Sequence, residues 1–327
     1  MRRATRTIAA LVFIGLLLAA GVYFYTHRPQ PSPVPLSGKL IVHYLDIGQG
    51  DSELILLPDG ETILIDAGDN GSPTVASLKT HGVTRIDLAI ATHPHSDHIG
   101  EMRDVMREFE VKEFWDSGFN NNTPTQRKML EDIAARGIKF STPRRGETRN
   151  FGVVSLDVLN PGPLLPDTNV NNASIVVKLT FGNTRLLFTG DAEVAAWQQM
   201  IEAEAEKLEA DVLKAAHHGS SNGTTRDILD AVRPSIVTIS CAAGNDYHHP
   251  HPKTIQLLEE RAKAMSFYRT DLDGEITVAC DGAVIDVTTD KPVVEAERYL
   301  TGDEVAGKLA GGGGRSSGRR HSAGGPR

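Results

Sequence analysis

The sequence predicts an α/β fold in which two packed sheets carry helices on both outer faces, a four-layer α/β/β/α sandwich. Between about residues 39 and 287, short apolar runs joined by tight turns are followed by apolar runs that alternate with helical segments, and this order occurs twice. The 327 residues are 40% hydrophobic and 23% charged, which suits a globular chain with a sizeable core. We therefore expect one domain at 39–290.

Local signals set the element boundaries in the first half of this domain. Pro58-Asp59-Gly60 is a turn signal between two apolar runs. Ser72-Pro73 and Thr123-Pro124 each place a capping side chain before a proline, which is typical of a helix start. We expect strands at 40–45, 53–57, 62–65 and 86–91, and helices at 72–81, 98–109 and 124–136.

The second half repeats the pattern of strand pairs followed by strands and helices in alternation. We expect strands at 153–159, 174–180, 185–189, 212–216, 236–240, 275–279 and 284–287, and helices near 192–205, 225–231 and 253–264. The two cysteines, Cys241 and Cys280, each end an apolar run. Two buried thiols are favoured over a disulfide between them.

The ends of the chain differ from the domain in composition. Residues 1–28 combine a basic start with an apolar run at 8–25, and so predict a targeting segment. Aromatic and basic residues at 23–28 favour a membrane anchor over a cleaved signal peptide, and either one would place the domain outside the cytoplasm. A proline-rich linker is expected at 29–38 and a C-terminal tail at 291–327, rich in glycine and arginine and disordered from about 311.

Charge is divided unevenly along the chain. The formal charge of −8 is the sum of +4 at 1–36, +3 at 301–327 and −15 between them. An acidic body argues against broad, charge-driven nucleic-acid binding, so a polyanionic substrate would need metal ions or a local basic cluster. Arg144, Arg145 and Arg149 form the densest basic group of the body, which could steer phosphates but which we interpret as a solvated charge run. The sequence shows no sign of an obligate protein partner.

Eight of the twelve histidines lie in three short stretches, which are His93, His95 and His98, then His217 and His218, and then His248, His249 and His251. The first stretch follows an apolar strand, so side chains two residues apart point the same way. The run His-Pro-His-Ser-Asp-His therefore directs His93 and His95 to one point and Asp97 and His98 to a neighbouring one. Mixed nitrogen and oxygen ligands of this kind suit two adjacent divalent metals.

Further candidate ligands end other predicted strands. Asp191 follows the strand at 185–189 and could bridge two metals, and His217 or His218 follows the strand at 212–216. Asp66 ends the strand at 62–65, where its carboxylate suits the second ring N–H of a ligand histidine and would fix that ring's tautomer.

Together these motifs resemble the metallo-β-lactamase superfamily. Three more stretches resemble the soluble hydrolase-like C-terminal domain of ComEC competence proteins and its stand-alone relatives. They are Tyr-Leu-Asp-Ile-Gly-Gln-Gly-Asp-Ser at 44–52, Asn-Asn-Ala-Ser-Ile at 171–175, and Asn-Asp-Tyr-His-His-Pro-His-Pro at 245–252, which precedes Tyr-Arg-Thr-Asp-Leu-Asp-Gly-Glu at 268–275. The likeness runs from about residue 39 to 287.

The resemblance implies a hydrolase with two divalent metals, Zn²⁺ or Mn²⁺, and nuclease or phosphodiesterase activity as the leading expectation. His93 and His95 would hold the first metal, and Asp97 and His98 the second. Asp191 would bridge the metals. His217 would complete the second site, with His218 as the alternative.

One departure from the superfamily pattern concerns the first metal. Many members place a histidine between the first motif and the bridging aspartate, yet residues 99–216 contain none. Asn171 or Asn172 occupies the corresponding region, so we expect a weaker shell for the metal at His93 and His95. Gln49 and Asp51 are expected near the pocket or behind the ligands on the strength of the resemblance.

The expected reaction is attack of a metal-activated water on a phosphodiester, such as DNA, with Asp97 orienting the water. His249 or His251, before Pro252, would contact the scissile phosphate or protonate the leaving oxygen. The alternatives are a hydrolase of a small ester, lactone or phosphorylcholine-type envelope group, and a non-catalytic, metal-stabilised binding protein. The acidic body favours the first of these alternatives.

Overall fold

The computed structural model describes residues 38–165 and 168–312, which we call the body. The expected targeting segment, most of the proline-rich linker and the tail beyond residue 312 lie outside these residues. Among the helices that the structure describes, none is long and apolar enough to cross a membrane.

The first sheet has eight strands, and the pairing of its strands changes from antiparallel to parallel halfway across. The strands β17, β16, β1, β2 and β3 pair antiparallel, whereas β3, β5, β7 and β8 pair parallel. In sheet order the bounds are β17 (Ile285–Thr289), β16 (Ile276–Cys280), β1 (Leu40–Tyr44), β2 (Glu53–Leu56), β3 (Thr62–Ile65), β5 (Leu88–Ala91), β7 (Glu113–Asp116) and β8 (Lys139–Ser141).

The second sheet has seven strands and the same change of direction. Its strands β9 to β12 pair antiparallel, and β12 to β15 pair parallel. The bounds are β9 (Thr148–Phe151), β10 (Val154–Asn160), β11 (Val176–Phe181), β12 (Thr184–Phe188), β13 (Val212–Lys214), β14 (Ile236–Ile239) and β15 (Ser266–Arg269). The strands β4 (Arg85–Ile86) and β6 (Glu110–Val111) form a separate two-stranded sheet. In the sequence they lie between strands of the first sheet.

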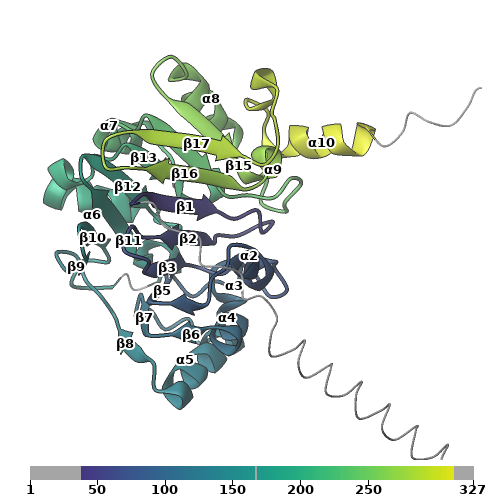
Figure 1. The fold of residues 1–327 in the computed structure, drawn as a ribbon. Coiled ribbons are helices and arrows are strands. Elements are labelled where there is room, and N and C mark those ends of the chain that lie inside the picture. The colour runs from purple at the N-terminus through teal and green to yellow at the C-terminus, as the bar shows by residue number, and fades with distance from the viewer. Residues whose placement is uncertain (1–37, 166–167, 313–327) are drawn as a thin grey trace, which may run out of the picture. The chain divides into compact units, whose positions relative to one another are not determined.

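Three apolar clusters fill the spaces between four layers (Figure 1). Alternate residues of both sheets, such as Val42 and Leu186, form the cluster between the sheets. The other two clusters lie between each sheet and its own helices, which bury residues such as Met129 and Trp197. Each fully buried side chain of this size contributes about 1.5–3 kcal/mol. The predicted α/β/β/α sandwich is confirmed.

Helices on the first sheet are α2 (Thr74–Thr80), α3 (Ser96–Ile99), α4 (Met102–Glu108) and α5 (Pro124–Arg136), and those on the second are α6 (Val194–Glu204), α7 (Arg226–Val232) and α8 (Pro252–Glu260). The short α9 (Thr270–Asp273) and a later α10 (Gly302–Gly312) follow. Thr123 caps α5 as expected, because its Oγ1 accepts from Gln126 N at 3.2 Å. Ser72 does not cap α2, since its hydroxyl donates to Ala67 O.

The predicted helix at 98–109 is divided in two. Gly100 separates α3 from α4, and a Cβ at this position would lie 2.3 Å from Asn70 N. This close approach ties the start of α4 to the loop that follows β3.

Several strands escaped prediction because they are short and contain charged or hydroxyl side chains. β7, β8, β9 and β15 have four residues or fewer, and none shows a clear apolar alternation. Pairing with neighbouring strands defines them, and that pairing is not a property of the local sequence.

Cys241 and Cys280 are both free and buried, as expected.

The three arginines of the basic group contact other parts of the body. Arg144 and Arg145 donate to backbone carbonyls, including Ser117 O and Leu159 O, and Arg149 pairs with Glu113. The cluster therefore holds loops of the body together, which differs from the solvated charge run that we expected.

Candidate metal centre

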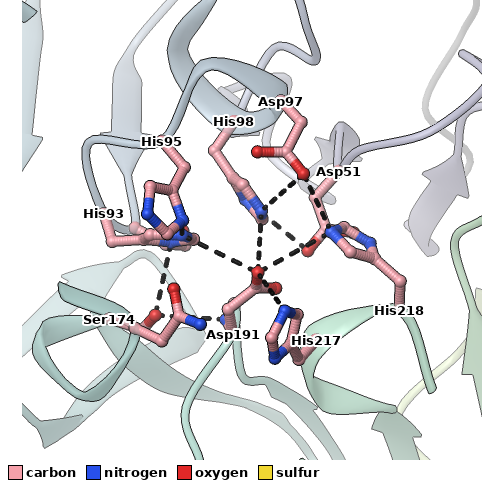
Figure 2. A network of polar contacts seen from close by, with 12 residues as sticks. Asp51, His93, His95, Asp97, His98, Ser174, Asp191, His217 and His218 are labelled. Atoms are coloured by element: carbon pink, nitrogen blue, oxygen red, sulfur yellow. Dashed lines mark hydrogen bonds and ion pairs between the residues drawn. The ribbon is translucent and has the colours of Figure 1, made fainter. Parts of the chain in front are cut away.

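Polar side chains from both sheets meet where antiparallel pairing gives way to parallel pairing. Asp66 follows β3, and the segment from His93 to His98 follows β5 in the first sheet. Asp191 follows β12, and the pair His217 and His218 follows β13 in the second sheet. Carboxyl ends of parallel strands leave backbone and side chains free to form a site there. Figure 2 shows the side chains of the two histidine segments, Asp97 and Asp191 pointing toward one another.

Asp191 lies at the centre of the cluster and is 1% exposed. Its Oδ2 lies 3.3 Å from His98 Nε2 and 3.7 Å from both His93 Nε2 and His218 Nε2. His217 Nε2 is 3.8 Å away. One carboxylate oxygen thus faces four imidazole nitrogens that come from two different sheets.

His93 and His95 form one side of the centre, which we call the His93 half. Their Nε2 and Nδ1 atoms lie 3.0 Å apart. Only hydroxyls stand behind His93, with Thr92 Oγ1 at 3.2 Å and Ser174 Oγ at 3.4 Å from its Nδ1. Burial, aided by His98, lowers the pKa of both rings. Neutral rings offer a free lone pair to a metal.

Asp97, His98 and His218 form the other side, the His98 half. Asp97 Oδ2 lies 3.3 Å from His218 Nε2 and 3.9 Å from His98 Nε2. Burial opposes the charged form of both rings, but Asp191 and other carboxylates outweigh it. The pKa of His98 is raised well above its ordinary value, and that of His218 is raised to about 10. The same carboxylates attract either a proton or a metal cation to this half.

Asp66 stands behind His98. Its Oδ2 accepts from His98 Nδ1 at 2.7 Å, and Thr92 donates to it through its backbone N–H and its hydroxyl. Asp66 is fully buried. These contacts fix the ring of His98 with Nδ1 protonated, which leaves Nε2 directed at Asp191.

Asp51 and Lys214 stand behind His218, and both are 1% exposed. Asp51 Oδ1 lies 3.2 Å from His218 Nδ1, and Lys214 Nζ donates to Asp51 Oδ2. Lys214 and His218 together outweigh burial and lower the pKa of Asp51. Sequence reasoning did not single out Lys214. The available signal was a lysine inside the apolar strand 212–216, because a buried lysine requires a carboxylate partner.

Backbone geometry brings these loops close together. Gly50, with φ of +128°, allows the β1–β2 loop to lie against Asp97, whose carbonyl oxygen would be 2.3 Å from a Cβ at position 50. Asp51 N donates to the same oxygen at 3.2 Å. His217 and His218 both adopt left-handed backbone conformations, with φ of 52° and 53°. Such conformations cost about 1–3 kcal/mol each in non-glycine residues, so the surrounding structure must hold them.

The structure separates the roles of His217 and His218. His218, and not His217, shares a candidate metal cluster with Asp97 and His98. His217 lies on the other side of Asp191 from Asp97 in Figure 2, with its Nδ1 3.2 Å from Glu193 Oε1. This arrangement corrects the expectation that His217 would complete the second site, because His218 occupies that place.

A pocket of about 300 Å³ opens over the centre and is lined by His95, Ser96, Asp97, Asp191, His217, His218, Tyr247 and His249. Tyr247 is 60% exposed and its ring stacks on His249 with centroids 5.8 Å apart. Burial, then His218 and His217, lower the pKa of His249 to about 3. A ring with this pKa is neutral near pH 7, which argues against the expected protonation of a leaving oxygen by His249.

His251 does not line the pocket. Its Nδ1 accepts from Ser221 N at 3.0 Å, and its Nε2 lies 3.2 Å from Tyr247 O. Both ring nitrogens are therefore used in holding loops. This corrects the expectation of a role in the reaction.

Asn172 is likewise engaged elsewhere. Its Oδ1 accepts from the backbone N–H of Glu193 at 3.1 Å and of Ala196 at 3.3 Å, at the start of α6. Ser174, which sequence reasoning did not single out, contacts His93 instead and accepts from Asp191 N at 3.1 Å. Gln49 accepts from Ala242 N at 3.2 Å, so it joins the β1–β2 loop to the second sheet.

The donor set fits a pair of divalent cations. The buried atoms His98 Nε2, His218 Nε2 and Asp191 Oδ1 have no hydrogen-bond partner among the described residues, although buried polar atoms are normally paired. Asp191 belongs to one candidate cluster with His93 and His98 and to another with Asp51 and His218, and its two carboxylate oxygens can serve two cations. Imidazole and carboxylate ligands suit zinc and manganese.

Comparison with known proteins relates the site to one family. The profile described as Metallo-beta-lactamase superfamily matches residues 45–243, a range that holds both halves of the centre. ComE operon protein 3 from Bacillus subtilis (strain 168) is 30% identical over 261 residues, covering 74% of this chain and 33% of that protein. Competence protein ComA from Neisseria gonorrhoeae is 26% identical over 269 residues, covering 80% and 34%.

Recombination protein 2 from Haemophilus influenzae is 27% identical over 244 residues, covering 72% of this chain and 28% of that protein. The chain thus spans about a third of the length of these curated relatives. Among solved structures, a mutant of CmlA beta-hydroxylase shares the fold, with a TM-score of 0.51 and 17% identity over 73% of this chain and 53% of that one.

Proposed function

The chain belongs to the metallo-beta-lactamase superfamily of metal-dependent hydrolases, and on that premise we propose that it is a phosphodiesterase that cleaves nucleic acid strands. The observation that carries the proposal is the placement of Asp191. Its carboxylate separates the His93 half from the His98 half and lines the pocket above them. A carboxylate in this position suits the bridge between two cations, an arrangement typical of enzymes that hydrolyse phosphate esters.

Each side chain of the centre has a definable task. When bound, the two cations would supply Lewis acidity to a phosphodiester and to the water that attacks it. Asp97 stays ionised, because His98 and His218 outweigh burial and lower its pKa. Its carboxylate lines the pocket and orients the attacking water. Asp66 and the backbone oxygen of Ser240 accept from the Nδ1 atoms of His98 and His218 and hold both rings in place.

The pocket supports binding of an extended phosphodiester. His249 Nδ1 is buried and has no hydrogen-bond partner among the described residues. A neutral imidazole at the pocket wall donates a hydrogen bond to a non-bridging phosphate oxygen. Tyr247 exposes its ring at the same wall, and an exposed aromatic ring stacks on a nucleobase.

The names of the relatives and the net charge of the chain bear on which substrate we propose. Two of the relatives carry names that refer to competence and recombination, and recombination is a reaction of DNA. The formal charge of −15 between residues 37 and 300 argues against a broad, charge-driven groove for nucleic acid. We therefore propose that a single strand is bound through phosphate at the metals and one base on Tyr247, without a long electrostatic groove.

The location of the reaction is part of the same proposal. The basic start and the apolar run at 8–25 support a targeting segment that places the body outside the cytoplasm. Protease accessibility of the body in intact cells tests this location. Digestion of the body without lysis supports it, and protection until lysis contradicts it.

A second candidate function is hydrolysis of a small ester, a lactone or a phosphorylcholine-type group of the cell envelope. The observation that favours it is the pocket lining, which contains neither lysine nor arginine among its eight residues. A strand of DNA would then gain little electrostatic attraction beyond the metals.

The full-length chain, loaded with Zn²⁺ or Mn²⁺, separates these candidates. The substrates are end-labelled single-stranded DNA, bis-p-nitrophenyl phosphate and a phosphorylcholine ester. We expect cleavage of DNA and bis-p-nitrophenyl phosphate, and loss of both activities with a chelator. Intact DNA under either metal, together with turnover of the small ester, would contradict the nuclease proposal and support the second candidate.

Two variants show whether the activity belongs to this site. His95→Ala removes a pocket-lining ligand and should abolish cleavage. His248→Ala is the matched control, because this exposed histidine pairs with Asp303 and does not line the pocket. Equal activity in both variants would show that a contaminating nuclease is being measured.

A further inference from the structure

A second group of metal-ligating side chains lies outside the metal centre. It consists of His43, His81 and Glu275, which we call the outer triad, and their candidate ligand atoms lie within 4.8 Å of one another. His43 is on β1, His81 directly follows α2, and Glu275 directly precedes β16. None of the three lines the pocket over Asp191.

Strand alternation places the outer triad on the helix-covered side of the first sheet. Leu40, Val42 and Tyr44 of β1 point into the core between the sheets, so His43 points to the opposite face. Thr277 is directly across from His43 on β16, and its Oγ1 lies 3.1 Å from His43 Nδ1. The outer triad is therefore separate from the metal centre, which lies at the carboxyl ends of strands.

The carboxylate of Glu275 lies between the two imidazoles. Its oxygens are 2.9 Å from His43 Nδ1 and 3.0 Å from His81 Nε2. The two rings are tilted by 32° to one another, with centroids 3.9 Å apart. A nitrogen of each ring faces the same carboxylate, so a single cation at the point where the three ligand atoms converge could use all three as ligands.

Burial and local charge also favour a cation. The side chains of His43, Glu275 and His81 are 11%, 16% and 21% exposed. Among the described residues, no lysine or arginine forms an ion pair with Glu275. A nearby lysine, Lys291, pairs with Asp46 instead at 3.1 Å. Two imidazoles are thus the partners of this mostly buried carboxylate, and a cation bound by all three side chains would compensate its charge.

We propose that the outer triad binds a zinc ion through His43 Nδ1, His81 Nε2 and the Glu275 carboxylate, with water completing a tetrahedral shell. Zinc–nitrogen and zinc–oxygen bonds of about 2.0–2.2 Å separate tetrahedral ligands by roughly 3.3–3.5 Å. The observed spacings of 2.9 and 3.0 Å need only a small opening of the side chains. Two imidazoles and one carboxylate favour zinc over magnesium or calcium, which prefer oxygen ligands.

Such a zinc ion would join three segments that otherwise meet through side-chain packing. His81 ends α2, and the start of α2 is tied to the loop after Asp66, since Thr74 Oγ1 donates to Ala67 O at 2.9 Å. A metal bond from His81 to β1 and to Glu275 therefore fixes both ends of this short helix. We assign the outer triad a structural role.

The experiment counts zinc bound to the full-length chain after dialysis, in wild type and in His81→Gln and Glu275→Gln. The difference between wild type and variant counts this site alone, whatever the occupancy of the metal centre. We expect each variant to bind one zinc fewer, with hydrolysis of bis-p-nitrophenyl phosphate within about twofold of wild type. His248→Gln, which alters an exposed histidine–carboxylate pair without a third ligand, should keep the wild-type count. An unchanged count in both variants would overturn the proposal.

A second measurement needs no variant and so is independent of variant folding. Diethylpyrocarbonate modifies free imidazole nitrogens, and mass spectrometry maps the modified residues in the wild-type chain. We expect zinc to slow modification of His81 at least about tenfold while His248 reacts at the same rate. Equal modification of His81 with and without zinc would refute zinc binding by the outer triad.

Discussion

The two halves of the metal centre differ in what lies behind their histidines. Behind His93 are the hydroxyls of Thr92 and Ser174, at 3.2 and 3.4 Å. Behind His98 is the carboxylate of Asp66, at 2.7 Å, and behind His218 are the backbone oxygen of Ser240, at 3.0 Å, and the carboxylate of Asp51, at 3.2 Å. A carboxylate behind a ligand imidazole raises its basicity and fixes its orientation, whereas a hydroxyl does this weakly.

This difference indicates that one fold can form two unequal cation sites around a single bridging side chain. The His98 half adds Asp97 as a ligand, and its surrounding carboxylates raise the pKa of both rings. The His93 half has lowered ring pKa values, and no third protein ligand besides Asp191 is found among the described residues. We expect the His98 half to bind its metal first and to hold it more tightly.

The largest effect is expected from the shared ligand. Asp191→Ala removes the carboxylate that both halves use, so both metals and the hydrolytic activity should be lost together, by at least about a thousandfold in kcat/KM. Metal content and hydrolysis of bis-p-nitrophenyl phosphate check this, with circular dichroism as the control for folding. Loss of only one metal equivalent relative to wild type would show that the halves do not depend on a common bridge, since any zinc at the outer triad is common to both proteins.

The neighbouring histidines provide the sharpest contrast between two single variants. His218→Ala removes a ligand of the His98 half and should lower activity by about a hundredfold or more, whereas His217→Ala should cost roughly tenfold or less. His217 Nε2 lies 3.8 Å from Asp191, and its Nδ1 lies 3.2 Å from Glu193. The reverse order of the two effects would return His217 to the second site and His218 to a supporting role.

Protons compete with the metal for the ring nitrogens of the His98 half and not for those of the His93 half. Because the pKa of His98 is raised and that of His218 is about 10, both rings hold a proton at neutral pH that metal binding must displace. Affinity at the His98 half should therefore rise with pH between about 6 and 8, by roughly tenfold per pH unit for each proton displaced. The neutral rings of His93 and His95 predict a nearly flat dependence. Calorimetric titration in buffers of different ionisation enthalpy measures the protons released, and equal release at both halves contradicts the contrast.

The side chain that contacts the second ring nitrogen of a ligand histidine can be changed in one half alone. Asp66→Asn takes the charge from the partner of His98 and should weaken metal binding at the His98 half by about tenfold to a hundredfold. Ser174→Ala, which removes a hydroxyl behind His93 and leaves the contacts of Thr92 with Asp66 intact, is the matched change for the other half and should cost less. An equal loss in the two variants would mean that carboxylates and hydroxyls support the rings equally well.

The smallest effect concerns substrate and leaves both halves intact. Tyr247→Ala should raise KM for single-stranded DNA by about fivefold to tenfold with little change in kcat, since loss of one base–aromatic stack costs about 1–3 kcal/mol at most. Metal content should not change. Steady-state kinetics with a dinucleotide and with an abasic analogue provide the comparison, and a loss of the same size for both substrates would exclude stacking.

Sequence signals located the centre because its ligands end predicted strands. The run from His93 to His98 and the residues Asp66 and Asp191 each follow an apolar strand, so the local pattern placed them at one edge. The alternation of strands and helices was enough to predict four layers. What the local pattern could not supply was the direction of neighbouring side chains, as the pair His217 and His218 shows.

The remaining differences arise from contacts between residues that are distant in sequence. Lys214 meets Asp51 across 163 positions, and neither the partner nor its position follows from local spacing. Asn172 and His251 are of the right type and lie in the right region, yet backbone groups of α6 and of the β13–α7 loop use their polar atoms. The outer triad likewise joins positions 43, 81 and 275, which share no motif.

Anomalous diffraction at the zinc edge, from crystals of the protein grown with substoichiometric zinc and then with excess, tests the inequality of the halves most directly. With little zinc, the account predicts one dominant peak among Asp97, His98 and His218. With excess zinc, a second peak should rise between His93 and His95, with Asp191 adjacent to both. A first peak at His93 and His95, or peaks inside the metal centre that do not contact Asp191, would contradict the account, whereas a separate peak at His43, His81 and Glu275 belongs to the outer triad.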